Sequence, residues 1–430
     1  MDRRTAAIHG GDLTRSDPGR CGGYWRPRMR VLFTTRGSSG HVGPLAPFAH
    51  ACRGAGHEVV VSAQRQFEGN VTRSGLPFSP VDEPARDEWM PLMAKFAAFD
   101  IETADGVMIS QFFAGLDLRA ELPALRALVE RWRPDVIVRE SWEFGSTLVA
   151  ELHQIPIVRV GLGLAEIEES SIKLAAPEVD RARAEVGLPS DPGGERLADA
   201  PFMTTIPAAL EDPNVSAPAR TRRFRFEVTP GAEELQDWWP GSVDPLVYLS
   251  FGSVAAGSHL PYYPALYHAA IEALSPLPIR LLVTVGDAAR EIEALGAVPR
   301  NVHVETWVTH DDVARRADVI VCHGGFGSTL GSLAHGAPLV VLPLFSRDQW
   351  ANGEAVVRVG AGVTVADDRT ARNVLDLPGA EVLGRLAGAV TAVLNNPSYR
   401  REAGRIADAM RALPPVSQSV QLLEEVAARH

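Results

Sequence analysis

Two glycine-rich turns in the second half of the chain present backbone amides beside hydroxyl and imidazole side chains. One spans residues 323–329 and the other residues 250–253, and each follows a short apolar segment that predicts a strand. A turn of this kind between a parallel strand and a helix directs free N–H groups and the positive end of the helix dipole at a ligand, which suits a diphosphate. The groups expected to contribute belong to His323, Gly325, Gly327, Ser328, Thr329 and Ser253.

The alternative is that both turns only allow helices to pack closely on strands. Neither turn meets the spacing of the usual dinucleotide-binding fingerprint. Ligands of parallel sheets bind at the carboxyl ends of the strands, so two such turns at neighbouring strand ends can flank the same phosphates. We therefore interpret the two turns as one phosphate site.

A third glycine-rich turn, residues 37–44, follows the first predicted strand and opens a helix. It contains His41, which is thereby placed at the mouth of a crevice. A histidine has an ordinary pKa of about 6.5, so its neutral ring can accept a proton near neutral pH. Glu140 follows another predicted strand, residues 135–139, and a carboxylate there can orient an imidazole and stabilise its protonated form. The alternative is that His41 only caps the helix and Glu140 pairs with a nearby arginine.

The elements that must position these residues alternate along the chain between strand and helix patterns. Such alternation predicts an α/β fold with parallel sheets covered by helices. The apolar strand patterns are residues 31–33, 59–61, 136–138, 157–160, 247–249, 281–285, 319–322 and 339–342.

The alternation is interrupted once, between residues 211 and 244, where proline, glycine and charged residues gather. We therefore predict two Rossmann-like domains, residues 29–215 and 244–400, joined by a linker at residues 216–243. The C-terminal residues 401–430 predict helices that pack back on the N-terminal domain.

The composition of the 430 residues, with 46% hydrophobic and 22% charged residues, is that of an ordinary globular protein. No apolar run reaches the roughly 18 residues that span a bilayer. The formal net charge of −11 and the lack of a basic stripe argue against a nucleic-acid partner. Cys21, Cys52 and Cys322 are too few and too scattered for a disulfide framework or a zinc site, so we expect a cytoplasmic protein.

Residues 1–28 are rich in arginine, glycine and aspartate and contain no apolar segment, so they do not predict a secretory signal. We expect a disordered leader. Met29 stands directly before the first predicted strand, and a start of translation there is the alternative.

Several of these residues belong to a known pattern. The segment 323–329, the segment Pro-Leu-Phe-Ser-Arg-Asp-Gln at residues 343–349 and Asn352 resemble the donor-binding signature of glycosyltransferase family one, especially its bacterial natural-product branch. The resemblance extends from about Met29 to the C-terminus. It implies the GT-B fold, in which the parallel sheets of two Rossmann-like domains face a central cleft.

The resemblance also implies roles at the donor end of the site. His323 and the groups around it would hold the diphosphate, while Trp307 and Val308 would border the base. Asp348 and Gln349 would bind sugar hydroxyls, which need both acceptors and donors when they are buried. Taken without the family, Asp348 is more often a helix N-cap, and Trp307 is about as often a core residue.

Two positions depart from the family's pattern. Members that use uridine nucleotides usually carry a glutamate eight residues after the motif histidine, where its carboxylate binds the ribose hydroxyls, but this chain has Gly331. In addition, Thr309-His310 stand where Pro-Gln is common. A site without the glutamate gains nothing from a 2′-hydroxyl, so we predict a thymidine-diphosphate deoxysugar as the donor.

By the same resemblance, His41, three residues before Pro44, is the catalytic base, and Glu140 stands where the family usually has an aspartate. A stretch rich in methionine and aromatic residues lies between them and predicts part of an adaptable apolar acceptor wall. A stripe of apolar residues at helical spacing usually belongs to the hydrophobic core. The alternative for any single one of these residues is therefore a core position. The acceptor-wall candidates are Trp89, Met93, Phe96, Phe112 and Phe113.

The combined prediction is an inverting glycosyltransferase of antibiotic biosynthesis that moves a sugar from a dTDP-sugar to a hydroxyl of an apolar, polyketide-like aglycone. No Asp-x-Asp motif or metal-ligand spacing occurs, so we expect neither a metal nor a cofactor besides the nucleotide sugar. The alternatives are a nucleotide-sugar epimerase on the same scaffold and a non-catalytic nucleotide-sugar-binding partner protein. A homodimer and transfer to carbon rather than oxygen also remain open.

Overall fold

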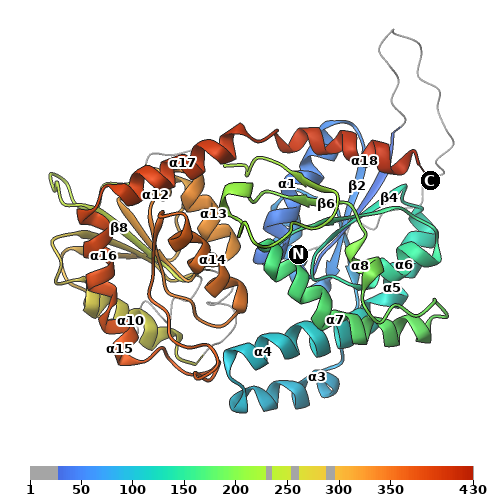
Figure 1. Cartoon of the computed structure of the whole chain (residues 1–430), viewed down its shortest axis with the longest axis horizontal. Coiled ribbons are helices and arrows are strands. Elements are labelled where there is room, and N and C mark those ends of the chain that lie inside the picture. The colour runs from blue at the N-terminus through green and yellow to red at the C-terminus, as the bar shows by residue number, and fades with distance from the viewer. Residues whose placement is uncertain (1–27, 229–234, 253–260, 287–295, 430) are drawn as a thin grey trace, which may run out of the picture.

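The computed structural model of the protein describes residues 28–228, 235–252, 261–286 and 296–429. These residues form two parallel β-sheets, one in each half of the chain, with helices packed on them (Figure 1). The predicted α/β fold class is therefore confirmed. The leader predicted for residues 1–28 lies, apart from Arg28, outside the described residues. None of the described helices has the length and apolar character needed to cross a bilayer.

The first sheet has, within the described part of the chain, seven parallel strands in the order β3-β2-β1-β4-β5-β6-β7. Leu32 of β1 pairs with Val60 on one side and with Ile137 on the other. Both faces of β1 and β4 are buried, as expected for parallel strands between layers of helices. The strands are β1 (Arg30–Thr34), β2 (Glu58–Gln64), β3 (Phe78–Val81), β4 (Val136–Glu140), β5 (Ile157–Val160), β6 (Phe202–Thr204) and β7 (Thr221–Arg223).

The strand β7 lies inside the segment that we predicted as the linker, so the first sheet continues beyond residue 215. Its sequence, Thr-Arg-Arg, carries no apolar signal because β7 is the edge strand of the sheet.

The second sheet, as far as the described residues show it, has six parallel strands in the order β10-β9-β8-β11-β12-β13. Its central strands β8 and β11 pair through apolar residues, among them Val247 with Val319 and Leu249 with Val321. The strands are β8 (Leu246–Ser250), β9 (Arg280–Thr284), β10 (Val302–Glu305), β11 (Val319–Cys322), β12 (Leu339–Val341) and β13 (Gly362–Thr364).

Both sheets reverse their strand order at one point. The chain moves outwards from β1 to β3 and then returns to the other side of β1 with β4; in the second sheet it moves from β8 to β10 and returns with β11. The loops that follow the two strands at such a switch point run in opposite directions and leave space for a ligand between them. The switch points are therefore the expected ligand positions of the two domains.

The helices that follow these strands carry the candidate site residues. Helix α1 (Ser39–Gly54) follows β1 and packs on the sheet through Val42, Leu45, Ala49 and Cys52, which are spaced as one face of a helix. In the second domain, α13 (Phe326–Ala334) follows β11 and α14 (Arg347–Arg358) follows β12. Helices α1 and α13 contact each other across the junction of the domains.

The other described helices surround the two sheets. In the first half they are α2 (Glu68–Arg73), α3 (Arg86–Met93), α4 (Ile101–Val107), the π-helix η3 (Met108–Asp117), α5 (Leu118–Trp132), α6 (Gly145–Leu152), α7 (Ala165–Glu185) and α8 (Glu195–Ala198). In the second half they are α10 (Tyr263–Leu274), α12 (His310–Ala314), α15 (Ala380–Gly384), α16 (Leu386–Asn395), α17 (Ser398–Ala412) and α18 (Ser419–Ala427). Short 3-10 turns connect several of them.

The two C-terminal helices run along one edge of the molecule and cross from one domain to the other (Figure 1). Helix α18 packs on α1, as predicted for residues 401–430. Helix α17 instead packs on α13 of the C-terminal domain, because Ala403, Ile406 and Met410 form an apolar stripe that joins that domain's core. Helix α18 therefore packs as predicted, whereas α17 packs mainly on the C-terminal domain and also contacts the turn η4 (Ala208–Leu210) of the N-terminal domain.

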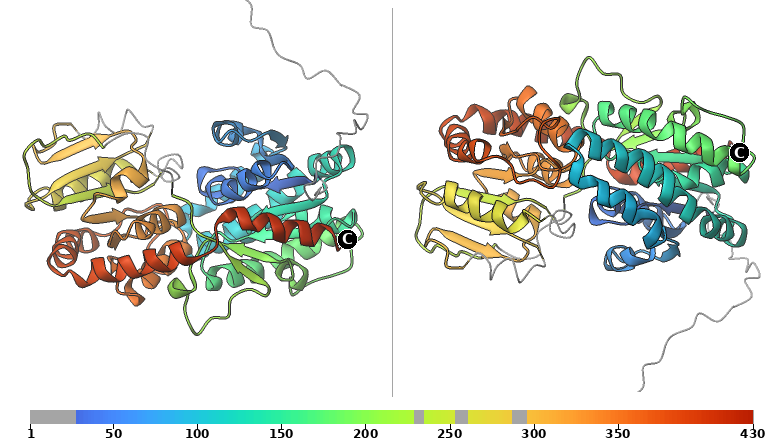
Figure 2. Two further views of the ribbon diagram at one scale, coloured as in Figure 1. Left: turned by 90° about the horizontal axis from the view of Figure 1, so that it is seen from above. Right: turned by 90° about the horizontal axis from the view of Figure 1, so that it is seen from below.

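On the other edge, residues 96–105, which we call the clasp, reach from the N-terminal domain to the C-terminal domain (Figure 2, right). Ile101 and Ala104 of the clasp are buried against Trp350 and Val374. The amide of Val374 donates a hydrogen bond of 3.1 Å to the carbonyl of residue 99. The clasp therefore joins the domains on the side opposite α17 and α18.

Candidate functional site

His41 and Glu140 meet at the switch point of the first sheet. His41 lies in the first turn of α1, directly after the loop that follows β1, and Glu140 is the last residue of β4. Because β1 and β4 are neighbours in the sheet, the two loops bring the side chains together, with His41 Nδ1 2.9 Å from Glu140 Oε1. Glu140 is fully buried, whereas 14% of the His41 side chain is exposed. The predicted pair forms. Among the described residues, no arginine side chain makes a direct ion pair with Glu140, although the charge of Arg36 acts on its carboxylate.

Glu140 is held as a carboxylate by the groups around it. Burial alone would raise its pKa, but His41, the amide of Trp142 and the charge of Arg36 together lower the pKa below the ordinary value of a glutamate. The Trp142 amide donates a hydrogen bond of 2.6 Å to Oε2. A carboxylate at this position accepts a hydrogen bond from the N–H group at His41 Nδ1 and leaves Nε2 as the basic nitrogen.

Aromatic rings surround the imidazole of His41. The ring of Trp142 lies 5.5 Å and the ring of Phe113 lies 6.5 Å from the His41 ring, both edge-on, and these two rings stack on each other. The indole Nε1 of Trp142 donates to Ser171, which fixes the ring. Trp142 was missed by the sequence prediction, and its position two residues after Glu140 was the only signal for it.

The five acceptor-wall candidates separate into three places. Phe112 and Phe113 lie on η3 beside the His41–Glu140 pair, whereas Phe96 packs at the edge of the small apolar cluster between the clasp and the C-terminal domain. Trp89 and Met93 lie on α3, without a described ring contact to His41. All five side chains are partly buried. Phe113 and Phe96 pack against apolar clusters, so the core alternative applies in part to these two.

The turn at residues 323–329 occupies the switch point of the second sheet. Gly324 has φ +84°, a backbone conformation that L side chains rarely adopt, and Asn352 donates a hydrogen bond of 2.8 Å to its carbonyl. A Cβ atom on Gly325 would lie 2.3 Å from the ring of His323, and one on Gly252, in the neighbouring turn, would lie 2.6 Å from it. The glycines therefore make room for the imidazole. Ser253, predicted to complete this neighbouring turn, lies outside the described residues.

Two buried polar atoms at this turn have no partner within the described structure. They are Nδ1 of His323 and Oγ1 of Thr329. Burial lowers the pKa of His323 to about 4, so its ring is neutral at physiological pH and one nitrogen carries a proton to donate. Unpaired buried polar groups cost free energy unless a ligand or water satisfies them. Together with the first-turn amides of α13, around Gly327 and Ser328, they form an anion-binding arrangement.

The two positions that depart from the family's pattern touch each other. A Cβ atom on Gly331 would lie 2.8 Å from Cδ2 of His310, so the imidazole of His310 occupies the space that a side chain at position 331 would need. Nε2 of His310 lies 3.3 Å from the hydroxyl of Ser332. Burial lowers the pKa of His310 to about 4, and its ring is neutral.

Trp307 and Val308 follow β10 at the edge of the second sheet. Trp307 is 70% exposed, so it is not a core residue, and the alternative raised for it is wrong. Val308 is partly buried against the core of the domain. The exposed indole is available to a ligand.

Gln349 lies in the first turn of α14 and holds the loop before it. Its buried Oε1 accepts hydrogen bonds of 2.8 and 3.2 Å from the amides of Leu344 and Phe345. The acceptor oxygen of Gln349 is therefore occupied, and its NH2 group is the part that can donate to a sugar hydroxyl.

Asp348 meets a second carboxylate that comes from the other domain. The hydroxyl of Ser346 lies 2.9 Å from Oδ1 of Asp105 in the clasp and also contacts Asp348. Burial, together with the charge of Asp348, raises the pKa of Asp105 to about 6. Burial also raises the pKa of Asp348, against the hydrogen bond from Ser346 and the charge of His41. One hydroxyl proton cannot satisfy both carboxylates, so the pair retains a proton more readily than either carboxyl alone.

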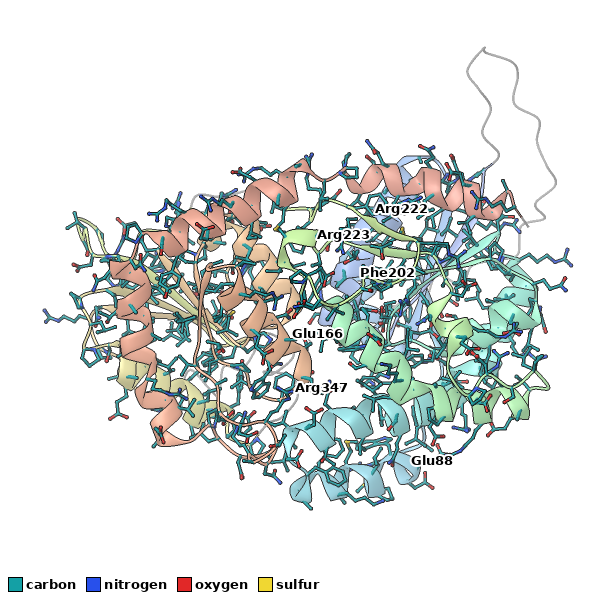
Figure 3. All side chains as sticks on the ribbon, viewed as in Figure 1. Glu88, Glu166, Phe202, Arg222, Arg223 and Arg347 are labelled. Atoms are coloured by element: carbon teal, nitrogen blue, oxygen red, sulfur yellow. The ribbon has the colours of Figure 1, made fainter. Side chains whose placement is uncertain are left out.

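Ion pairs close the clasp next to this acidic pair. Arg347, labelled in Figure 3, lies 3.1 Å from Glu102 of the clasp, and Arg369 lies 2.7 Å from the other oxygen of Glu102. The first turn of α14, which carries Asp348, is therefore held in place by both domains.

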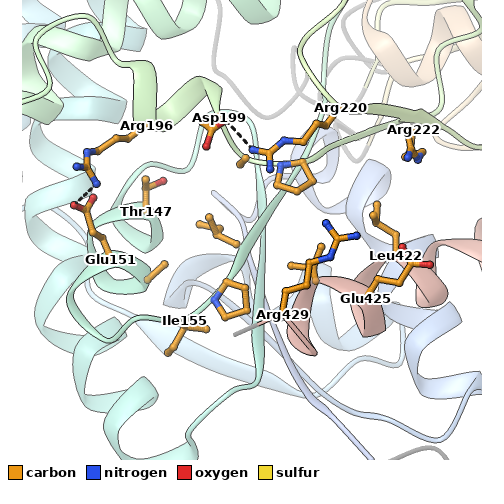
Figure 4. A pocket seen from close by; sticks show the side chains of 16 residues that line it. Thr147, Glu151, Ile155, Arg196, Asp199, Arg220, Arg222, Leu422, Glu425 and Arg429 are labelled. Carbon is orange, nitrogen blue, oxygen red and sulfur yellow. Dashed lines mark hydrogen bonds and ion pairs between the residues drawn. The ribbon is translucent and has the colours of Figure 1, made fainter.

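A separate hollow of about 440 Å³ opens on the N-terminal domain (Figure 4). Its walls include Pro156 and Pro201, which directly precede β5 and β6, and parts of α18. It lies at the amino ends of the strands, whereas ligands of parallel sheets bind at the carboxyl ends. The ion pairs Arg196–Glu151 and Arg220–Asp199 occupy its rim. We therefore place the candidate site at the two switch points and not here.

No group of three or more histidine, cysteine or acidic side chains in the described ranges is arranged to hold a metal ion.

Comparisons with known proteins agree with this architecture over both domains. Models of the erythromycin biosynthesis protein CIII-like family match residues 50–242 with the N-terminal domain and residues 271–426 with the C-terminal domain. The chain is 28% identical to L-demethylnoviosyl transferase of Streptomyces niveus, covering 90% of this chain and 96% of that protein. It is also 28% identical to 4′-demethylrebeccamycin synthase of Lentzea aerocolonigenes, covering 92% and 99%. The structure of the glycosyltransferase SsfS6 of Streptomyces sp. SF2575, complexed with thymidine diphosphate, matches with a TM-score of 0.66 at 26% identity, covering 93% of this chain and 100% of that one.

Proposed function

Because this chain belongs to the erythromycin biosynthesis protein CIII-like family of GT-B natural-product glycosyltransferases, we propose that it transfers a deoxysugar from a thymidine diphosphate donor with His41 as the general base. Sugar transfer to a natural-product aglycone is the activity of the relatives. The observation that carries the proposal is the 2.9 Å contact between His41 and the buried Glu140 at the switch point of the first sheet.

The proton and the new bond follow from this geometry. Nε2 of His41 accepts the proton of the acceptor hydroxyl while the hydroxyl oxygen forms a bond to the anomeric carbon. The bond from that carbon to the diphosphate oxygen breaks, and the electron pair leaves with the nucleoside diphosphate. A single displacement of this kind inverts the anomeric configuration. Glu140 stabilises the imidazolium that forms on His41.

The leaving group is held by neutral donors in this proposal. The first-turn amides of α13, Thr329 and the neutral ring of His323 donate hydrogen bonds to the diphosphate oxygens, and no metal is required. The polar atoms of His323 and Thr329 that have no partner in the described structure support this assignment, because a diphosphate satisfies both.

The position of His310 supports a thymidine rather than a uridine nucleotide. A glutamate at position 331, the ribose-binding residue expected of uridine-using members, would collide with the His310 ring. The chain therefore has neither the carboxylate nor the room for it. A ribose 2′-hydroxyl finds no acceptor at position 331, and a 2′-deoxyribose loses nothing there.

Turnover with matched donors tests the proposal. The protein is incubated with thymidine and uridine diphosphates of the same sugar and with a panel of polyketide-like and phenolic aglycones, and products are identified by mass spectrometry. We expect glycoside from the thymidine donor and an inverted anomeric configuration by NMR. Preference for the uridine donor contradicts the nucleotide assignment, retention contradicts the single displacement, and an epimerised donor without glycoside identifies an epimerase instead.

A further inference from the structure

Arg36 lies between the aromatic residues of η3 and the carboxylates behind His41. It follows β1 by two residues, and only 12% of its side chain is exposed. Its guanidinium carbon is 3.5 Å from the centre of the Phe113 ring and 5.5 Å from that of Phe112. The guanidinium also pairs with Asp117 at the end of η3. Arg36 therefore contacts the part of the acceptor wall that lies nearest to His41.

The charges that face Arg36 come from four elements. They are Asp117 of η3, Glu121 of α5, Glu140 of β4 and Glu143 of the loop after β4. Burial lowers the pKa of Arg36 to about 10, against the charges of the three glutamates, so the side chain remains a cation at neutral pH.

Two of the four carboxyls are satisfied without Arg36. Glu121 accepts a hydrogen bond of 2.9 Å from the amide of Gly145, and burial and the charge of Glu143 raise its pKa well above the ordinary value of a glutamate. Glu143 accepts hydrogen bonds from Thr34 and from the amide of Ser146. Asp117 and Glu140 are the carboxylates that share the cation.

The backbone amide of Arg36 contacts the Glu140 oxygen that faces His41, and the charge of the Arg36 side chain separately lowers the pKa of Glu140. The amide of Arg36 donates a hydrogen bond of 3.3 Å to Oε1 of Glu140, which is also the oxygen 2.9 Å from His41 Nδ1. A buried carboxylate this close favours the protonated imidazole, which cannot act as a base. A cation that faces the same carboxylate opposes that effect and favours the neutral ring.

We propose that Arg36 is a positioning residue for sugar transfer, whose charge offsets that of Glu140 beside His41 and whose planar guanidinium holds Phe113 beside the His41 ring. The proposal rests on the function proposed above, in which His41 is the base. The two roles of Arg36 depend on different properties, its charge and its shape, and can therefore be separated.

The test compares two substitutions by the pH dependence of kcat/KM and by the KM for the acceptor. Arg36→Gln removes the charge, and we expect the acid limb of the profile to move to higher pH by about 0.5 to 1 unit. Arg36→Lys keeps the charge but loses the planar stacking, so the limb stays in place while the KM for the acceptor rises by about 3- to 10-fold. Asp117→Asn removes a negative charge, and its acid limb should move in the opposite direction, to lower pH.

Arg223→Gln is the matched control, because Arg223 has a similar exposure of 16% and an ion pair with Glu211 but lies away from His41. Its acid limb should coincide with that of the unmodified protein. Stabilisation of each variant by thymidine diphosphate in thermal melts shows that the donor half is folded. If Arg36→Gln does not fold, the role of the Arg36 charge is tested by Asp117→Asn alone, whose acid limb should move to lower pH.

Two results overturn the proposal and differ in meaning. Acid limbs that stay unmoved in Arg36→Gln and Asp117→Asn, with His41→Ala inactive, refute the role of Arg36 alone. Full turnover by His41→Ala refutes the proposed function, and the role of Arg36 falls with it.

Discussion

Nδ1 of His41 lies 2.9 Å from Oε1 of Glu140, and the other carboxylate oxygen accepts a hydrogen bond of 2.6 Å from the amide of Trp142. Both oxygens of Glu140 are thus engaged, which fixes the carboxylate and, through it, the tautomer of His41. The pair joins two segments that are 99 residues apart in the chain.

The first prediction concerns this pair. His41→Ala should lower kcat by about 10²- to 10⁴-fold, the usual contribution of a general base. Glu140→Gln should also lower kcat, because the amide keeps the shape but cannot stabilise the imidazolium. Affinity for thymidine diphosphate, measured by calorimetry, should not change in either variant. His50→Gln, on the exposed part of α1, is the control. A kcat within about threefold of the unmodified protein in both variants contradicts the assignment of His41 as base.

The second prediction concerns the nucleotide. Gly331→Glu alone should weaken the binding of both thymidine and uridine diphosphates, because the new side chain collides with His310. The double variant with His310→Gln should restore binding and shift the preference towards uridine diphosphate, since the carboxylate can then accept from a 2′-hydroxyl. Gly388→Glu, at an exposed helix position with open space, controls for the added charge. An unchanged ratio of the two affinities in the double variant would falsify the nucleotide assignment.

The third prediction concerns the acidic pair between the domains. The pKa of Asp105 is raised by burial and by Asp348 to about 6, above the roughly 3.9 of an unfolded chain. The folded state therefore binds this proton more tightly than the unfolded chain does. The free energy of unfolding that the proton contributes is complete below about pH 4 and is lost as the pH rises through about 6, so that ionised Asp105 carries a penalty at neutral pH. Asp105→Asn removes this penalty.

Asp105→Asn should therefore raise the melting temperature by about 1 to 3 °C at pH 7.5 and by less at pH 4.5. Asp87→Asn, on the exposed surface of α3, is the control. A gain that is equal at both pH values, or larger at pH 4.5, is inconsistent with a shared proton.

The fourth prediction concerns His323. Burial lowers its pKa to about 4, so the folded protein excludes a proton that the unfolded chain binds below about pH 6.5. The free energy of unfolding is unaffected by this group above pH 6.5 and decreases as the pH falls towards 4. The loss is about 2 kcal/mol at pH 5. His323→Gln should therefore become more stable relative to the unmodified protein by about this amount between pH 7.5 and pH 5.

Urea denaturation at the two pH values measures this difference. The effect of carboxyl titration on stability cancels in the comparison, because both proteins contain the same carboxyl groups. A stability difference that does not depend on pH means that His323 is accessible to protons in the folded protein.

Much of the fold was predictable because it depends on local patterns. The buried central strands, such as β1 and β11, are apolar runs with a glycine-rich turn after them, and each was predicted from those residues. The strands that the sequence did not reveal are β3, β6, β7, β10 and β13. Four of these strands lie at sheet edges, where no apolar run is needed, and β6 is only three residues long, which is too short for a recognisable pattern.

The site divides in the same way. The motif at residues 323–329 could be recognised because strand, turn and phosphate-binding groups are consecutive in the chain. Arg36 and Trp142 could not, because an arginine in a glycine-rich turn and a tryptophan after a strand have many ordinary roles. Their function depends on which carboxylate and which ring they face, and both partners lie on other elements.

The sequence by itself determined the fold class, the donor motif and the identity of the two residues proposed for proton transfer. Only the tertiary structure decided that His41 meets Glu140 and that the ring of His310 occupies the space beside Gly331. It also decided that Asp105 lies next to Asp348, because Ser346, which contacts both, is 241 residues from Asp105 in the chain. The physical reason is that strands and turns are specified by neighbouring residues, whereas a hydrogen bond or a steric exclusion between distant segments exists only once packing has brought them together.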